Sequence, residues 1–175
     1  GIDDSMVRQA PRLNAILHEL AAFVGDAPVI GHNVRFDLGF LQKANVLNLN
    51  RVIDTYALAS VLMPAASRYN LGALGQQLGI LLPATHRATD DAKVTMAAFN
   101  KLFELARELP LDLVAEIVRL SEPIEWDANW VFQEALRSRA KDTLLVEEIR
   151  SEESIEGVEQ DLLALEGMDT KLAAK

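Results

Sequence analysis

Two short apolar segments, each bounded by residues that break regular structure, constrain the fold of this chain most strongly. Residues 27–31 (APVIG) and 51–54 (RVID) are too short for helices, and we predict both as buried strands. Longer segments with helical periodicity precede, separate and follow them. An alternation of strands and helices is typical of an α/β layer fold. A sheet of two strands is marginal alone, so we expect further strands to complete it.

Segments in which apolar residues recur every three or four positions predict the helices. Asn33 is expected to cap the helix after the first strand, and Gly79 to end the helix over residues 69–79. Other helices are predicted over residues 12–24, 55–63, 88–107, 111–120 and 127–140. The expected buried stripes are Leu13, Ile16, Leu17, Leu20 and Phe23 in the first helix, and Ala88, Ala92, Thr95, Phe99, Leu102 and Ala106 in the longest.

Composition narrows the class of protein. The 175 residues are 50% hydrophobic, which is enough for one domain with an appendage. A net charge of −9 argues against a generic nucleic-acid binder, but ten acids and only four bases lie in residues 141–175. There is no cysteine, and no apolar run approaches the ~20 residues of a membrane span. We therefore expect a cytoplasmic protein that does not associate with membranes.

A first candidate for chemistry is Asp37, in the segment Gly31–Asp37 (GHNVRFD). It is expected in the first turn of a helix, on the same apolar face as Phe40 and Leu41. A carboxylate on a buried face is costly unless it is paired or bound to a metal ion. The alternative is that Asp37 only stabilises the start of its own helix.

A second candidate is the segment HRATDD at residues 86–91. Asp91 shares a helix face with Val94, Thr95 and Ala98, which predicts that it points inward, whereas Asp90 points to solvent. A loop His five residues before an inward Asp is compatible with two distinct roles in metal-dependent hydrolysis. The Asp would hold a metal ion and His86 would take a proton from a metal-bound water. Taken alone, His86 is more often a capping or surface residue.

Other polar and aromatic residues are expected to be structural. Asp54 is predicted to cap the helix that begins at Thr55. His18 and His32 are interpreted as structural, and Trp126 and Trp130, four residues apart, as packing on one surface.

The order of these segments is more specific than any one of them. GHNxxFDxxFL, then IDT, then a short helix ending in LGI, then HRATDDA resembles the DEDDh (DnaQ-like) 3′–5′ exonuclease family, from Gly1 to about Glu108. The resemblance implies a ribonuclease H-like fold and two Mg²⁺ or Mn²⁺ ions. It also implies metal binding by Asp37 and Asp91. By the same resemblance, His86 is the general base, and Asn33 and Phe36 flank the terminal nucleotide.

One departure from the family is serious. Its first motif, an Asp-x-Glu pair on the first strand, has no counterpart here, since Asp3 and Asp4 fall where the family has a turn and a short helix. The sequence begins with Gly rather than Met, so we expect a fold truncated at the N-terminus, without its first strands. With two of four carboxylates, the chain is expected to bind metal weakly and to have little activity. An unpaired sheet edge is expected to favour dimers.

The C-terminal part gives a second resemblance. The segment LSEPIEW at residues 120–126 is similar to the connector of exonucleases fused to DinG-type helicases. We therefore predict a partial exonuclease domain over residues 1–108 and a helical connector with an acidic tail over residues 109–175.

Several functions remain open at this point. The expected partners are the 3′ end of single-stranded DNA, or RNA, and a covalently fused helicase module. The alternative is a non-catalytic interaction or regulatory module that keeps the nuclease fold. A small-molecule metallohydrolase would not explain the order of the motifs.

Overall fold

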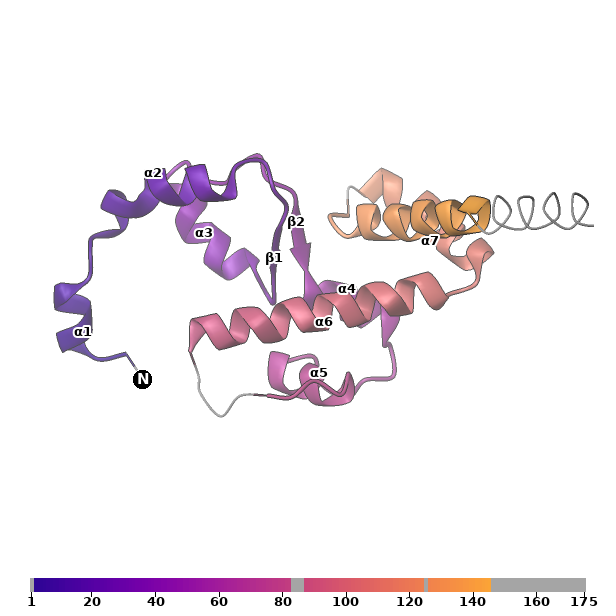
Figure 1. The fold of residues 1–175 in the computed structure, drawn as a ribbon, viewed down its shortest axis with the longest axis horizontal. Coiled ribbons are helices and arrows are strands. Elements are labelled where there is room, and N and C mark those ends of the chain that lie inside the picture. The colour runs from indigo at the N-terminus through magenta and orange to yellow at the C-terminus, as the bar shows by residue number, and fades with distance from the viewer. Residues whose placement is uncertain (1, 83–86, 125, 146–175) are drawn as a thin grey trace, which may run out of the picture. The chain divides into compact units, whose positions relative to one another are not determined.

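The computed structural model describes residues 2–82, 87–124 and 126–145 (Figure 1). The chain divides into two compact units, residues 1–135 and 136–175, and the described part of the second is helical. The elements of the first unit are α1 (Asp4–Gln9), α2 (Leu13–Val24), β1 (Val29–Gly31), α3 (Arg35–Lys43), β2 (Val52–Asp54), α4 (Thr55–Leu62), α5 (Leu71–Gln77), α6 (Ala88–Glu108), α7 (Leu111–Ser121) and the 3-10 turn η1 (Glu122–Ile124). A further helical segment begins at residue 129.

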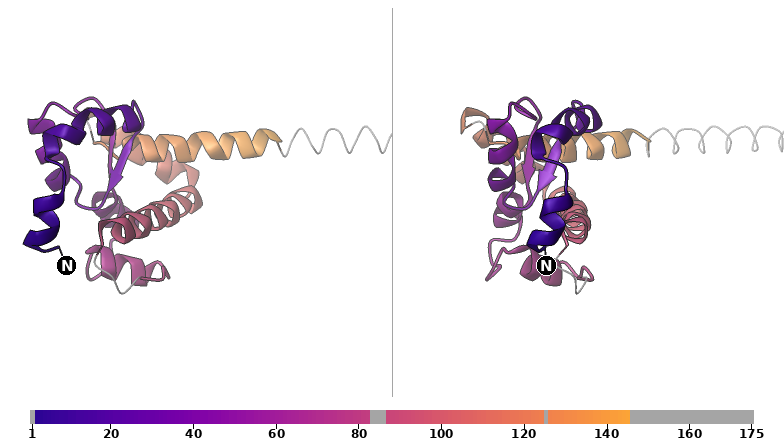
Figure 2. Two further views of the ribbon diagram at one scale, coloured as in Figure 1. Left: turned by 60° about the vertical axis from the view of Figure 1, so that its left-hand side comes forward. Right: turned by 90° about the vertical axis from the view of Figure 1, so that its left-hand side faces the viewer.

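The two predicted strands form a parallel pair in which Val29 lies opposite Val52 and Gly31 opposite Asp54. Figure 2 shows them side by side from two further directions. Because parallel neighbours need a crossover, α3 lies between them in the sequence. Within the described residues these are the only strands, so the α/β alternation is confirmed while most of the structure is helical.

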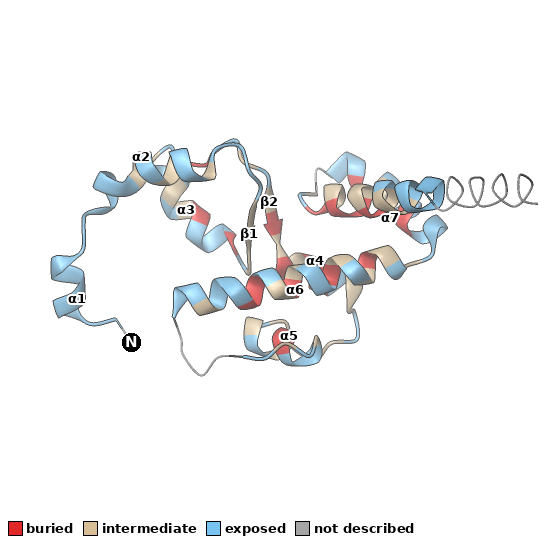
Figure 3. Ribbon diagram, in the orientation of Figure 1, coloured by how far each residue is buried: buried red, intermediate tan, exposed pale blue. Residues whose placement is uncertain are grey.

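Helix α6 is the long element on which the first unit is packed, since it contacts α4, α5 and β1. Its buried face is Val94, Thr95, Ala98, Leu102 and Ala106, red in Figure 3. Thr95, Leu102 and Ala106 were expected there. Ala88 and Ala92 are exposed and Phe99 is half-buried, because the face that contacts α4 and α5 runs through Ala98 instead.

A smaller apolar cluster joins α2 to α3. Its buried residues are Val34, Leu38, Val46 and Leu47, and Leu17, Ala21, Val24, Val29, Leu41 and Val52 pack against it. The stripe predicted for α2 was wrong in part, since Phe23 is 88% exposed and Leu13 and Ile16 are also exposed. Residues 17, 21 and 24 follow the i, i+4, i+7 spacing of one face, and only that face meets the cluster.

The end of the first unit is helical, as expected. Val114 in α7 is fully buried, as are Val131 and Phe132 after residue 129. The ring of Trp126 packs against that of Phe132, with 5.5 Å between the ring centroids. Trp126 precedes the helix that begins at residue 129, so the helical spacing expected for Trp126 and Trp130 does not apply.

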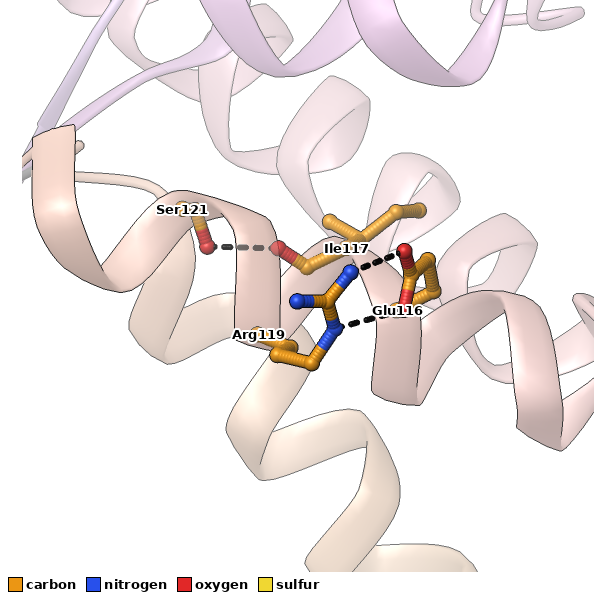
Figure 4. A network of polar contacts seen from close by, with 4 residues as sticks. All are labelled: Glu116, Ile117, Arg119 and Ser121. Carbon is orange, nitrogen blue, oxygen red and sulfur yellow. Dashed lines mark hydrogen bonds and ion pairs between the residues drawn. The ribbon is translucent and has the colours of Figure 1, made fainter.

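Two local bonding patterns mark the last turns of α7 (Figure 4). Arg119 donates hydrogen bonds to Glu116 through Nε at 2.8 Å and Nη2 at 2.5 Å. The hydroxyl of Ser121 donates to the carbonyl oxygen of Ile117 at 2.7 Å. Ser121 is therefore buried without an unsatisfied hydroxyl.

In the stretches that the structure describes, no helix has both the length and the apolar character needed to cross a bilayer. Most of the acidic segment 141–175 lies outside the described residues.

We expect Gly31→Ala to destabilise the fold by about 1–3 kcal/mol, because its Cβ would lie 2.5 Å from Cβ of Val34. Gly39→Ala, in α3, is the matched control: its Cβ meets nothing within 4 Å, so helix propensity predicts a gain of about 0.5–1 kcal/mol. Urea unfolding measures both. Equal effects of the two substitutions would show that the turn after β1 is not tightly packed.

Candidate metal and nucleic-acid site

The turn between β1 and α3 is fixed by a carboxylate from the end of the neighbouring strand. Asp54 Oδ1 accepts hydrogen bonds from the backbone N–H of Asn33 and Tyr56, both at 2.9 Å, and Oδ2 accepts from Val34 N–H at 3.2 Å. The bond to Tyr56 confirms the predicted cap of α4. The two bonds to the turn were not predicted, because nothing local in the sequence relates residues 33 and 54.

The expected cap of α3 by Asn33 is wrong. The helix begins at Arg35 after Val34, which makes no side-chain cap bond, and Asn33 has a left-handed φ of 58°. Asn is one of the few residues that tolerate this conformation. The bonds that Asp54 accepts go to the N–H groups of Asn33 and Val34, which precede the helix, so the first turn of α3 has no side-chain cap.

Thr55 adds a second tie between the two strand ends. It is fully buried, and its hydroxyl donates to the carbonyl oxygen of Gly31 at 3.1 Å. His32 Nδ1 lies 2.9 Å from the same hydroxyl oxygen. The imidazole also meets the edge of the Tyr56 ring at 6.0 Å between centroids.

A cavity of about 930 Å³ lies beside this turn. It is lined by residues of β1, α3 and the first turns of α5 and α6, together with His32 and Leu82. Asp37 in the first turn of α3 and Asp91 in the first turn of α6 both line it. No Lys or Arg is among the described residues of the lining. Two carboxylates from distant parts of the sequence thus face one space without a basic side chain.

Neither acid is buried, which corrects the expectation that they lie on buried faces. Asp37 and Asp91 are exposed, and Phe40, expected inward beside Asp37, is 56% exposed. The buried face of α3 is instead Val34 and Leu38, because that side packs on the α2 cluster. In α6, the residues expected on the same inward face as Asp91 are buried as predicted: Val94, Thr95 and Ala98.

Asp90 also differs from the prediction. It was expected to point to solvent, yet it is half-buried and its carboxylate lies 3.7 Å from Lys93 Nζ.

The other predicted site residues are placed differently. Asn33 and Phe36 are not in the lining of the cavity; Phe36 is 69% exposed, with its ring 5.4 Å from that of Phe40. His86 lies outside the described residues. Sequence reasoning missed His32 as a lining residue. Its position directly after Gly31, at the end of a strand, was the available signal.

The donor set fits part of a divalent-cation site. Carboxylate oxygens are the ligands that Mg²⁺ and Mn²⁺ prefer, and two like charges on one cavity favour a cation there. Over the described ranges, however, no group of three or more His, Cys, Asp or Glu side chains is arranged to hold a metal ion. The cavity therefore presents two carboxylates and not a complete ligand set.

Burial lowers the pKa of His32 below its usual value of 6.5. A hydrogen bond with the Tyr69 backbone and the negative charge of Asp54 act in the opposite direction, but burial outweighs them. The imidazole is therefore neutral around pH 7.

Because the folded pKa of His32 is lowered, the unfolded chain binds a proton more readily than the folded chain near pH 6.5. The contribution of neutral His32 to stability is complete above that pH and is lost as the pH falls through it. We expect the melting temperature to drop from about pH 7.5 to about pH 5.5, and to drop less in His32→Asn. His18→Asn, on the exposed side of α2, is the control. An identical pH dependence in His32→Asn and the parent would contradict the assignment.

The chain is similar to known exonucleases. Residues 1–99, more than half of the chain, match the family described as Exonuclease (RNase_T). Over 141 residues the chain is 33% identical to proteins named 3′–5′ exonuclease DinG from Staphylococcus aureus strains USA300, NCTC 8325 and COL. The alignment covers 78% of this chain but only 16% of each relative, so the chain spans about 16% of their length.

The family implies a ribonuclease H-like α/β fold, of which the described residues show one parallel strand pair. The family resemblance drawn from the motif order is confirmed. This chain belongs to the DnaQ-like (DEDDh) exonuclease family and is related to the DinG-type 3′–5′ exonucleases.

Proposed function

We propose that this chain supplies half of the carboxylate ligands of a metal-dependent 3′–5′ exonuclease. The observation that carries the proposal is that Asp37 and Asp91, from two different helix starts, line the same cavity, whose described lining contains no Lys or Arg. The substrate would be the 3′ end of single-stranded DNA, or of RNA, and the products nucleoside 5′-monophosphates. A complete site would hold two Mg²⁺ or Mn²⁺ ions.

Asp37 and Asp91 would hold the divalent ion. When bound, the ion stabilises negative charge on the reacting oxygens of the phosphodiester. Asp37 lies in the first turn of α3 and Asp91 in the first turn of α6, the helix end at which acidic side chains are commonly found. His86 would accept the proton of the attacking water.

The exposed ring of Phe36 would pack against the terminal base, and Asn33 would contact the same nucleotide. Aromatic side chains bind unpaired bases by stacking, and an exposed ring is available for this without rearrangement of the core. The net charge of −9 does not oppose this assignment, because a bound cation supplies the positive charge that meets phosphate.

A second candidate is a non-catalytic module that keeps the nuclease fold. It is favoured because, in the described part of the chain, no group of three or more His, Cys, Asp or Glu side chains is arranged to hold a metal ion. The two candidates differ in whether the full-length polypeptide supplies the remaining carboxylates. We also propose that a helicase module is fused to the same polypeptide, since the named relatives are much longer than this chain.

In the full-length polypeptide, Asp91→Asn should lower exonuclease activity by about 100-fold or more, because a metal ligand contributes several kcal/mol of transition-state stabilisation. Release of the terminal nucleotide from a 3′-labelled oligonucleotide measures it. Asp90→Asn is the matched control, since Asp90 is adjacent but does not line the cavity. Unchanged turnover in Asp91→Asn would refute the role of this carboxylate.

The 175-residue chain alone should release mononucleotides at no more than about 1% of the rate of the full-length polypeptide, because two carboxylates hold a divalent ion weakly. The same labelled oligonucleotide, with Asp91→Asn as the background, provides the measurement. A chain that hydrolyses at the full rate would show that two carboxylates suffice.

A further inference from the structure

We propose that Asp54 is a positioning residue of the metal site, one that holds the Asp37 carboxylate toward Asp91 without touching the ion. Asp54 does not line the cavity. Its carboxylate nevertheless bonds to the turn from which α3 starts and to the first turn of α4. The inference rests on the proposed function, because it assigns to Asp54 an effect on cation binding.

The bonding exceeds what a helix cap requires. A cap of α4 needs one acceptor for the N–H of Tyr56, and Asp54 provides it. The two additional bonds, to the N–H groups of Asn33 and Val34, run to a turn that is far away in the sequence. Without Asp54, these two backbone N–H groups would need another acceptor.

The turn that Asp54 holds is unfavourable in itself. Asn33 adopts a left-handed φ of 58°, a conformation that costs most L-residues about 1 kcal/mol or more and that Asn tolerates better than most. Such a conformation persists only where the surroundings fix it. Without the Asp54 carboxylate, the backbone at Asn33 and Val34 would be free to relax.

Relaxation of this turn would reach Asp37 directly. Asp37 lies three residues after Val34, in the first turn of α3, so it moves with the start of that helix. Asp91 is held separately, because α6 contacts β1, α4 and α5. The two carboxylates are thus attached to different parts of the fold, and Asp54 joins the strand end and α4 to the part that carries Asp37.

Thr55 does not replace this role. Its hydroxyl bonds to Gly31 and His32, which precede Asn33, and not to the two N–H groups that Asp54 holds. The tie through Thr55 fixes the end of β1, whereas the tie through Asp54 fixes the start of α3. The two roles can therefore be separated by substitution.

Asp54→Ser separates capping from positioning. Serine is a good N-cap and can still accept from Tyr56 N–H, but its single short hydroxyl cannot also reach both N–H groups of the turn. Asp3→Ser is the matched control, since Asp3 caps α1 by bonds to the N–H groups of Ser5 and Met6 and does not line the cavity.

The measurement is Mn²⁺ titration of the 175-residue chain, followed by paramagnetic broadening of backbone amide signals. This readout detects weak binding and is independent of catalysis. In the parent chain, the amides around Asp37 and Asp91 should broaden together. In Asp54→Ser, the amides around Asp37 should need roughly tenfold more Mn²⁺ to reach the same broadening, which is the usual effect of losing a residue that orients a metal ligand. Thermal unfolding should show Asp54→Ser and Asp3→Ser folded alike.

The outcomes distinguish this inference from the proposed function. Joint broadening at unchanged Mn²⁺ concentration in Asp54→Ser would overturn the positioning role and leave the proposed function intact. No broadening near Asp37 and Asp91 in the parent chain would overturn both. If Asp54→Ser does not fold, Asp54→Asn replaces it in the test. Asn keeps one acceptor oxygen but places its NH₂ group against a backbone N–H, so one of the bonds is lost. Broadening at unchanged Mn²⁺ in that variant would likewise overturn the inference.

Discussion

The Asp54 carboxylate is the interaction on which the arrangement of the site depends. It lies where the second strand ends, and it accepts hydrogen bonds from three backbone N–H groups at two separate helix starts. Both helix starts would cost free energy without it. Unsatisfied N–H groups are costly at either start, and the turn before α3 also holds Asn33 in a left-handed conformation. One side chain therefore couples the strand pair, the start of α3 and the start of α4.

The chemistry of the cavity follows from charge rather than from a complete set of ligands. Two carboxylates face it, and the described lining carries no basic side chain to balance them. A divalent cation is the partner that such a site favours, and it would also attract the phosphate of a nucleic acid. Under the proposed function, a bound cation would let an acidic protein act on an acidic polymer, which would reconcile the composition with membership of an exonuclease family.

Local patterns predicted the local features. The strands at residues 27–31 and 51–54, the helices and the cap by Asp54 follow from runs, spacing and breakers that lie close together in the chain. The exposure of Phe40 and the conformation of Asn33 did not follow, because both depend on contacts with distant segments. That Asp37 and Asp91 share a cavity was inferred from the order of motifs and not from periodicity, which cannot bring two helices together. The role of His86 stays a prediction.

The alanines of α6 have a mechanical consequence. Ala98 and Ala106 are fully buried, as is Ala59 in the contacting helix α4, so the two helices approach closely and have little room to slide. Asp91 lies near one end of α6 and Ala106 near the other. Ala106 lies roughly 22 Å along the axis from Asp91, so a tilt of about 5° there would move the carboxylate by about 2 Å. Packing along the whole of α6 therefore sets the position of Asp91 at the cavity.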